Sequence, residues 1–286
     1  MALLEIEDMT KDFGGLTALS EVSISVENGE IFSLIGPNGA GKTTLFNLIT
    51  GVFAPTRGAV RFKDEDLFRY RPVGWLRFVE RTRKPYQITR SGIGRTFQNI
   101  RLFANMTALE NVMVGIDAHG RTGVGRAMLR TKGQRDEERL TLEGAFRLLD
   151  FVGIAKYAND LARNLSYGDQ RRLEIARAMG TDPSLLMLDE PAAGMNPVEK
   201  AGLMELIRQV RDQGITVVLI EHDMKVVMGI SDRVAVLDFG QKIAEGRPQE
   251  VQRDPRVIQA YLGSGAPVPT KDADPGDAGG DGDAAP

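Results

Sequence analysis

The sequence contains no cysteine, and this absence excludes disulfides and thiolate metal ligands. Such a composition is typical of a protein that works in a reducing cytosol. Apolar runs such as residues 215–220 are far too short for a membrane span. Acidic residues at Glu5, Glu7 and Asp8 stand where a signal peptide would be apolar. We therefore expect a chain that neither crosses a membrane nor is exported.

An excess of basic charge is also missing. The formal net charge is −3, whereas binding to a nucleic-acid backbone requires a strong positive field. Nucleic acid is therefore not expected as the main partner. The chain does have 286 residues, 42% of them hydrophobic, which is enough to bury a large core with an inserted subdomain.

Apolar patterning predicts an α/β fold interrupted by helices. Residues 3–9, 22–26 and 30–35 are typical of strands. Thr107 and Glu110 match a helix capping box. Apolar residues then recur at helical spacing at Leu142, Ala145, Phe146, Leu149 and Val152.

Alternation of strands and helices returns in the second half of the chain. Residues 185–188 and 216–220 are typical of buried strands, and an amphipathic segment at 197–212 separates them. This pattern predicts a parallel sheet with crossover helices.

These patterns divide the chain into four predicted parts. Residues 1–98 form the first part of a core, 99–164 a helical subdomain, and 165–263 the second part of the core. Residues 264–286 have almost no large apolar side chain, so they cannot offset the entropy of ordering and are predicted to be disordered.

A glycine-rich loop follows the strand predicted at 30–35. Its residues are Gly36, Pro37, Asn38, Gly39, Ala40, Gly41, Lys42 and Thr43, which fit G-x-x-x-x-G-K-[ST], and a helix is predicted at 42–50. The loop amides and the helix N-terminus would close around phosphates, Lys42 would add charge, and Thr43 would ligate Mg²⁺. The alternative is a plain turn before a helix. The strand and helix context favours binding of ATP with Mg²⁺.

Two carboxylates, Asp189 and Glu190, follow the strand predicted at 185–188. The carboxyl edge of a parallel sheet is where such sheets bind ligands. Asp189 would hold Mg²⁺ through its hydration shell, and Glu190 would orient or deprotonate the attacking water. Alone, such a pair is equally typical of a helix N-cap, but the glycine-rich loop favours ATP hydrolysis.

Two further polar sites allow two interpretations each. His222 follows the strand predicted at 216–220, so it is either a γ-phosphate contact or a locally satisfied loop histidine. Ser166 and Asp169 match a capping pattern before a helix predicted at 171–179. They form either a plain cap or an anion site that a second protomer offers to the γ-phosphate.

In chain order, these motifs resemble the landmarks of an ABC transporter nucleotide-binding subunit. They are the loop at 36–43, Gln98 within residues 96–99, the signature segment at 165–170, the carboxylates at 185–190 and His222. The resemblance covers about residues 3–262. It implies an α/β P-loop NTPase fold with a parallel-sheet core, an N-terminal antiparallel β-subdomain and an inserted helical subdomain.

The resemblance also implies roles for single residues. Glu190, His222 and Gln98 would be catalytic, and Thr43, Gln98 and Asp189 would serve the metal ion. Gln98 would also sense the membrane subunit, and Phe13 would stack on adenine. Nucleotide contacts would come from Phe13, Gly36, Pro37, Asn38, Gly39, Ala40, Gly41, Lys42, Thr43, Thr44, Ser166 and Gly168.

More narrowly, residues 95–98, 167–177, 192–197, 221–224 and 261–263 are similar to the ATPases of branched-chain amino acid importers. This similarity implies an ATP-hydrolysing motor subunit, cytoplasmic and peripheral on the inner face of the cell membrane. It would pair head to tail with a second, identical or paralogous ATPase and with integral membrane permease subunits. An external substrate-binding protein would act on it indirectly, and the cargo would be branched-chain amino acids or related amides. The alternative is a soluble ABC-class regulatory ATPase.

Three residues depart from the general family pattern. Tyr167 replaces a glycine, Asp169 replaces a glutamine and Asn196 replaces an aspartate; the first and third are usual for the narrower group. Asp169 either lies near the partner's phosphate or turns toward Ser166. The segment 64–90, with five aromatic and seven basic residues, either packs on its own domain or meets lipid headgroups or the membrane subunit.

Overall fold

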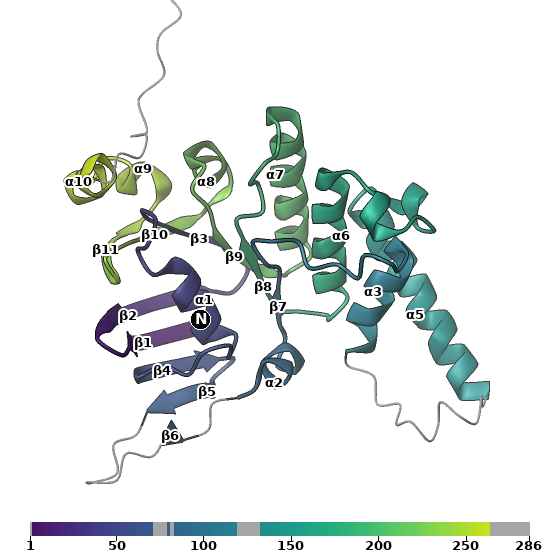
Figure 1. The fold of residues 1–286 in the computed structure, drawn as a ribbon, viewed down its shortest axis with the longest axis horizontal. Helices are drawn as coiled ribbons and strands as arrows, with labels where there is room; N and C mark the ends of the chain where they lie inside the picture. The colour runs from purple at the N-terminus through teal and green to yellow at the C-terminus, as the bar shows by residue number, and fades with distance from the viewer. Residues whose placement is uncertain (1, 71–78, 81–82, 119–131, 264–286) are drawn as a thin grey trace, which may run out of the picture.

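The structure is a computed structural model that describes residues 2–70, 79–80, 83–118 and 132–263 (Figure 1). The first half contains β1 (Ala2–Phe13), β2 (Leu16–Glu27), β3 (Ile31–Ile35), α1 (Lys42–Ile49), β4 (Arg57–Phe62), β5 (Glu65–Tyr70), β6 (Val79–Glu80), α2 (Pro85–Arg90), β7 (Ile93–Arg95) and α3 (Ala108–Asp117). The second half contains α5 (Lys132–Phe151), the short 3₁₀ helices η1 (Ala155–Tyr157) and η2 (Ala162–Asn164), α6 (Tyr167–Met179), β8 (Leu185–Asp189), α7 (Pro197–Asp212), β9 (Thr216–Ile220), α8 (Met224–Ile230), β10 (Arg233–Asp238), β11 (Gln241–Gly246), α9 (Pro248–Val251) and α10 (Pro255–Gly263).

The first sheet is antiparallel, with strand order β2-β1-β4-β5-β6. The strands predicted at 3–9 and 22–26 lie inside β1 and β2, which are both longer than predicted. Asp8 and Glu21 have positive φ angles of 46° and 52°, and the register between the two strands shifts near them. Such irregularities interrupt the alternation of apolar and polar side chains along a strand. The sequence pattern therefore predicted only part of each strand.

The second sheet has the order β11-β10-β3-β9-β8-β7. Its strands are parallel except for β11, which pairs antiparallel with β10. Every residue of β3, β8 and β9 is buried, as expected for parallel strands covered on both faces. The predicted strands at 30–35, 185–188 and 216–220 are therefore confirmed to within one residue at each end.

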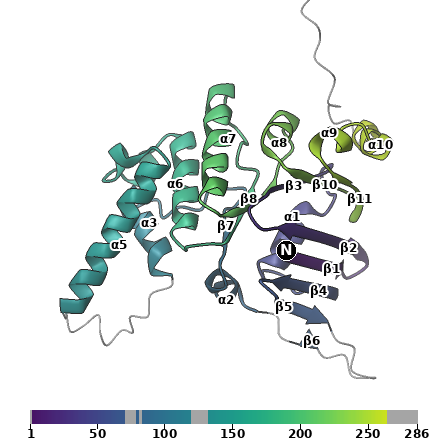
Figure 2. The ribbon, with the colours of Figure 1, turned by 180° about the vertical axis from the view of Figure 1, so that it is seen from behind.

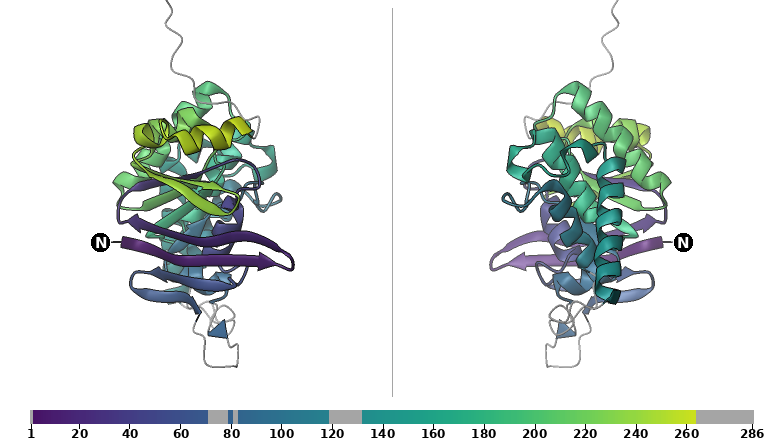
Figure 3. Two further views of the ribbon diagram at one scale, coloured as in Figure 1. Left: turned by 90° about the vertical axis from the view of Figure 1, so that its left-hand side faces the viewer. Right: turned by 90° about the vertical axis from the view of Figure 1, so that its right-hand side faces the viewer.

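Different helices cover the two faces of this second sheet. Alternate side chains such as Phe32 and Met187 pack with α1 and the first sheet, whereas Ile31 and Leu186 pack with α7. Figures 1 and 2 show α1 between the two sheets and α7 and α8 on the opposite face of the second sheet. Figure 3 shows β1 and β2 crossing the molecule below β10 and β11.

Helices α3, α5 and α6 stand together on the side of the molecule away from β1 and β2 (Figure 1). The capping box of α3 is confirmed: the Thr107 hydroxyl accepts from the Glu110 amide at 3.1 Å, and the Glu110 carboxylate accepts from the Thr107 amide at 2.8 Å. The helix at 197–212 is also confirmed. The start predicted for the helix at 171–179 is wrong, because Ser166 is the cap and α6 begins at Tyr167.

The predicted fold class, α/β with a parallel core sheet, an antiparallel N-terminal sheet and inserted helices, is confirmed. Among the described residues, no helix combines the length and apolarity that a membrane span requires. Phe68 is buried in the core of its own domain and Tyr86 is exposed. Trp75, Phe78 and the tail at 264–286 lie outside the described residues.

Candidate functional site

The glycine-rich loop connects the end of β3 to the start of α1. Gly36, Gly39 and Gly41 have φ angles of 149°, 81° and 101°, a region that side chains other than glycine rarely adopt. A Cβ on Gly36 would lie 2.1 Å from the carbonyl oxygen of Leu237, and one on Gly41 would lie 2.7 Å from that of Ala18. The loop therefore needs glycine at these positions, and it forms a cradle of backbone groups.

Lys42 begins α1 with its side chain folded back onto this loop. Its Nζ donates to the carbonyl oxygens of Gly36 at 2.7 Å and Pro37 at 2.9 Å. Burial lowers the pKa of Lys42, while the negative charges of Glu190 and Asp189 raise it. The ammonium group is thus held at the mouth of the cradle, where phosphate oxygens would take the place of the two carbonyls.

Asp189 ends β8 and forms a buried ion pair with Arg95, which ends the neighbouring strand β7. Arg95 Nη2 lies 3.1 Å from Asp189 Oδ2, and the two side chains are 8% and 3% exposed. Burial raises the pKa of Asp189, and the Arg95 charge opposes this effect. Asp189 Oδ1 is buried without a hydrogen-bond partner in the described part of the chain. An unpaired carboxylate oxygen beside a phosphate cradle fits a hydrated Mg²⁺ ion, with Thr43 at the start of α1 as a further oxygen ligand.

Arg95 was not singled out as a site residue from the sequence. Its Nη1 also donates to Asn47 Oδ1 at 2.7 Å and to Thr50 Oγ1 at 2.8 Å, both on or next to α1. It therefore joins β7, β8 and α1 around Asp189. The available signal was a basic residue at the carboxyl end of a parallel strand, but β7 has only three residues and was not predicted.

Gln98, Glu190 and His222 come from three separate segments and meet at one oxygen atom. Gln98 Nε2 donates to Glu190 Oε2 at 3.0 Å, and His222 Nδ1 lies 3.7 Å from the same oxygen. The Glu190 amide donates to the Ile220 carbonyl at 2.9 Å, which holds the ends of β8 and β9 together. The φ angle of Glu190 is 48°, a conformation that costs energy in a residue with a side chain and often marks functional sites.

Glu221 is a second residue that sequence reasoning missed. It is buried, and its carboxylate accepts from the Ala192 amide at 2.7 Å and from the His222 amide at 3.1 Å. Burial raises the pKa of Glu221, although these amide donors lower it. The carboxylate thereby fixes the backbone that carries His222, whose own side chain is exposed.

Phe13, the predicted adenine contact, ends β1 at the turn into β2. Its ring is 41% exposed and makes an edge-on contact with Phe53, with ring centroids 5.4 Å apart. Strand β2 begins at Leu16, and its third residue, Ala18, lies against Gly41 of the loop. The hairpin that carries Phe13 therefore borders the glycine-rich cradle.

Ser166 and Gly168 lie at the N-terminus of α6. The Ser166 hydroxyl accepts from the Asp169 amide at 3.2 Å and donates to Asp169 Oδ2 at 2.7 Å, so the Asp169 carboxylate is turned toward Ser166. Within the described ranges, no hydrogen bond or ion pair joins Ser166 or Gly168 to Lys42, Asp189 or Glu190. Within the described part of one chain, the predicted site residues therefore form two separate groups. One group surrounds the glycine-rich loop, and the other lies at the N-terminus of α6.

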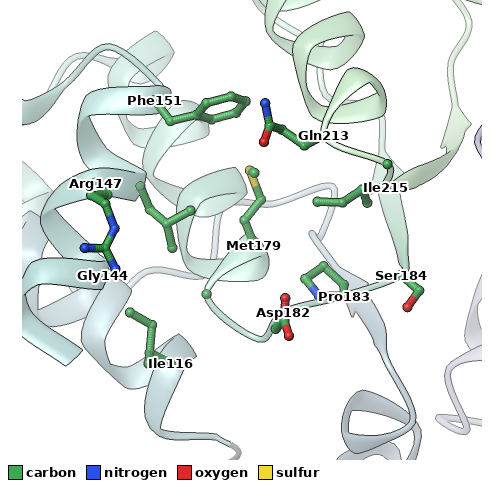
Figure 4. Close-up of a pocket in the computed structure, with 13 residues that line it drawn as sticks. Ile116, Gly144, Arg147, Phe151, Met179, Asp182, Pro183, Ser184, Gln213 and Ile215 are labelled. Atoms are coloured by element: carbon green, nitrogen blue, oxygen red, sulfur yellow. The ribbon is translucent and has the colours of Figure 1, made fainter. Parts of the chain in front are cut away.

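The cradle side of the first group is open. Asn38, Gly39, Thr43, Gln98 and His222 are exposed around the buried Lys42 and Asp189. A separate cavity of about 700 Å³ lies at the opposite edge of the sheet (Figure 4). Its lining includes Ser184 and Ile215, which precede β8 and β9. None of the predicted site residues lines it; Lys42, Asp189, Glu190 and His222 lie at the carboxyl ends of the parallel strands.

Comparison with known proteins gives matches over most of the chain. Residues 19–193 match the family model described as ABC transporter, and residues 241–267 match the one described as Branched-chain amino acid ATP-binding cassette transporter. The chain is 46% identical over 262 residues to the high-affinity branched-chain amino acid transport ATP-binding protein LivG of Salmonella typhimurium, covering 91% of this chain and 98% of that protein. It is 45% identical over 262 residues to BraF of Pseudomonas aeruginosa, with the same coverage.

Solved structures give a matching result. A nucleotide-free ATP-binding cassette from an ABC transporter superposes with a TM-score of 0.76 at 33% identity, covering 91% of this chain and 99% of that one. The ADP conformation of such a cassette has the same TM-score at 32% identity, covering 92% and 99%. A dimeric cassette in a post-hydrolysis state, bound to ADP and phosphate, has a TM-score of 0.68 at 26% identity, covering 86% and 98%.

Proposed function

From the premise that this chain belongs to the ABC transporter family and is an ATPase of that family, we propose that it drives an importer of branched-chain amino acids or related amides. The observation that carries this proposal is the similarity, over 91% of the chain, to relatives whose names specify branched-chain amino acid transport. Residues 241–267 also match a family model whose description names branched-chain amino acids, and this second match supports the proposed cargo.

In the proposed mechanism, the loop at 36–43 and Lys42 bind the phosphates of ATP. The start of α1 contributes Thr43 and Thr44, and Phe13 contacts the adenine ring. A Mg²⁺ ion held by Thr43, Gln98 and the unpaired oxygen of Asp189 would neutralise phosphate charge. Arg95 keeps Asp189 in place by holding its other oxygen.

Glu190 is the proposed general base. Its Oε2 is held by Gln98 and approached by His222, so the carboxylate has a fixed orientation from which it can accept a proton from water. The Gln98 amide can also orient the water, and His222 can contact the γ-phosphate.

The second half of the site is proposed to come from another ATPase subunit, identical or paralogous, in a head-to-tail dimer. Ser166 and Gly168 lie at a helix N-terminus, which favours an anion, yet they do not reach the cradle of their own chain. The open side of the cradle at Asn38 and Gly39 leaves room for that helix end from a partner.

Permease subunits are the other proposed partners, and they would hold the chain at the inner face of the cell membrane. An external substrate-binding protein would act through them. A largely apolar cavity of about 310 Å³ next to Gln98 is lined by Phe97, Phe103, Val114 and Arg177, among others. Phe103 and Val114 are 48% and 39% exposed, and an apolar surface beside the catalytic glutamine suits a permease segment.

Co-purification tests the transport role. The full chain is extracted from membranes in mild detergent, and the proteins that accompany it are identified. We expect an integral membrane permease, and ATP hydrolysis by the reconstituted complex that rises with the matching binding protein and a branched-chain amino acid. Recovery of the chain without any integral membrane protein would contradict the proposal and favour a regulatory ATPase.

A further inference from the structure

An ion pair lies completely inside the molecule on one face of α6. Arg171 and Glu174 are 0% and 1% exposed, and Arg171 Nη1 lies 2.8 Å from Glu174 Oε2. A buried pair of this kind often adds no stability over apolar residues of the same volume. Its remaining hydrogen bonds therefore indicate what it does.

Those bonds go to the backbone of the segment that carries Gln98. Arg171 Nη1 donates to the Phe97 carbonyl at 2.8 Å, and Nη2 donates to the Gln98 carbonyl at 2.9 Å. Glu174 Oε1 accepts from the Phe97 amide at 3.2 Å and from the Arg101 amide at 3.5 Å. The pair thus binds the segment 97–101 through both carbonyl and amide groups, and this segment itself belongs to no strand or helix.

The arginine is itself oriented by the first turn of α6. Tyr167 Oη accepts from Arg171 Nη2 at 3.3 Å, and the Tyr167 ring lies beside Gly194, on which a Cβ would approach the ring to 3.4 Å. This contact gives a physical role to the tyrosine that stands where the general family pattern has glycine. Arginine suits the position because its planar fork can hold two carbonyls and a carboxylate at once.

We propose that Arg171 and Glu174 are positioning residues that join the Gln98 segment to α6. The side-chain amide of Gln98 holds Glu190 Oε2 at 3.0 Å, and the same helix begins with Ser166 and Gly168. The pair therefore links the helix that begins with Ser166 and Gly168 to the amide that holds the Glu190 carboxylate. This inference rests on the proposed roles of Gln98 and Glu190 in hydrolysis, and it does not depend on which molecule is transported.

The test is a double-mutant cycle on ATP hydrolysis by the purified full chain, without membrane subunits. Arg171→Met and Glu174→Met are introduced together, so that neither charge is left buried alone. We expect the melting temperature to be retained, ATP affinity to change by less than about twofold, and kcat to fall by at least about 10-fold through misplacement of Gln98. In a Gln98→Ala background, the same pair of substitutions should cause no further loss, since residues that act through one another are not additive.

Arg172→Met is the matched control. Arg172 is the next residue of α6, and its Nη1 donates to the Val152 carbonyl at 2.8 Å, away from the 97–101 segment, so kcat should remain near the wild-type value. If the double variant does not fold, Arg171→Lys is taken through the same cycle, because lysine keeps the charge and lacks the fork. Equal losses of kcat with and without Gln98 would overturn the inference, and so would a loss in Arg172→Met as large as in the Arg171 and Glu174 variants. Failure of co-purification would affect only the transport role.

Discussion

At the scale of single residues, Glu190 and Lys42 should have separable effects. Glu190→Gln keeps an oxygen that Gln98 can hold but removes the base, so ATP affinity should be preserved while kcat falls by at least about 10²-fold. Lys42→Ala should weaken nucleotide binding itself, because its charge meets the phosphates in the ground and transition states alike. Fluorescent-nucleotide binding and phosphate release are measured on both variants in the same Mg²⁺ buffer.

The exposed Glu138 on α5 supplies a control, since Glu138→Gln should leave both measurements unchanged. The assignment of Glu190 as the base is wrong if Glu190→Gln hydrolyses ATP at a near-normal rate. It is equally wrong if that variant loses nucleotide affinity as strongly as Lys42→Ala does.

Glu221 should make the stability of the chain depend on pH. Burial raises its pKa in the folded state above the ordinary value of 4.5, so its contribution to stability is fully present below the unfolded pKa and is lost as pH rises through the folded pKa. The wild type should therefore lose stability relative to Glu221→Gln between about pH 4 and neutral pH. One pH unit between the two pKa values corresponds to about 1.4 kcal/mol.

Urea unfolding of both proteins across this pH range measures the effect. The difference between their free energies of unfolding should shrink or reverse with rising pH and then become constant. A difference that does not change with pH would mean that the folded and unfolded pKa values of Glu221 are equal.

Local sequence motifs named Glu190 and His222, and the resemblance to a family added Gln98; these three do converge on one oxygen atom. The carboxylate and the histidine each follow a predicted buried strand, so they can be recognised without a structure. Arg95 and Glu221 act through contacts between residues far apart in the chain, such as Arg95 with Asp189. The segments 95–98 and 221–224 contributed to the family resemblance, but no role for Arg95 or Glu221 could be assigned because their partners are far away in the sequence or are backbone groups.

At the scale of elements, the cap of α7 should contribute a measurable part of the stability. Asn196 Oδ1 accepts from the amides of Val198 and Glu199 at 2.9 Å each, and the Glu199 carboxylate accepts from the Asn196 amide. Asn196→Ala should lower the free energy of unfolding by about 1 kcal/mol. Asn196→Asp should change it by only a few tenths, because aspartate caps equally well. Denaturant titration that shows equal losses for both variants would contradict the capping role.

Regular apolar spacing explains which elements the sequence could predict. The amphipathic pattern at 197–212 predicted α7 to the residue, and the structure adds the Asn196 cap in front of it. The long strands β1 and β2 were predicted only in part, because the irregularities at Asp8 and Glu21 change the alternation. The order of strands in the two sheets depends on contacts across the whole chain, and only the resemblance to a family indicated the division into sheets.

At the scale of the whole molecule, the two groups of predicted site residues lie apart, so one chain does not enclose the cradle. Lys42, Asp189 and Glu190 surround the cradle, whereas Ser166 and Gly168 lie at the start of α6 without a bond to them in the described residues. If ATP binds at the cradle as proposed, a single chain would leave its γ-phosphate open to solvent on one side. Burial of that phosphate between two chains would supply the missing donors and would exclude water other than the attacking molecule.

ATP should consequently drive two chains together. In Glu190→Gln protein, which we expect to bind ATP but to hydrolyse it slowly, excess ATP with Mg²⁺ should shift the mass measured by light scattering from one chain to two. ADP should not do so, because it lacks the phosphate that both chains would bind. Lys42→Ala combined with Glu190→Gln should remain monomeric, since it binds nucleotide weakly. If the natural partner is a paralogue, the same shift should appear only when that ATPase is added. A chain that stays monomeric with ATP, both alone and with the candidate partner, would rule out a shared site.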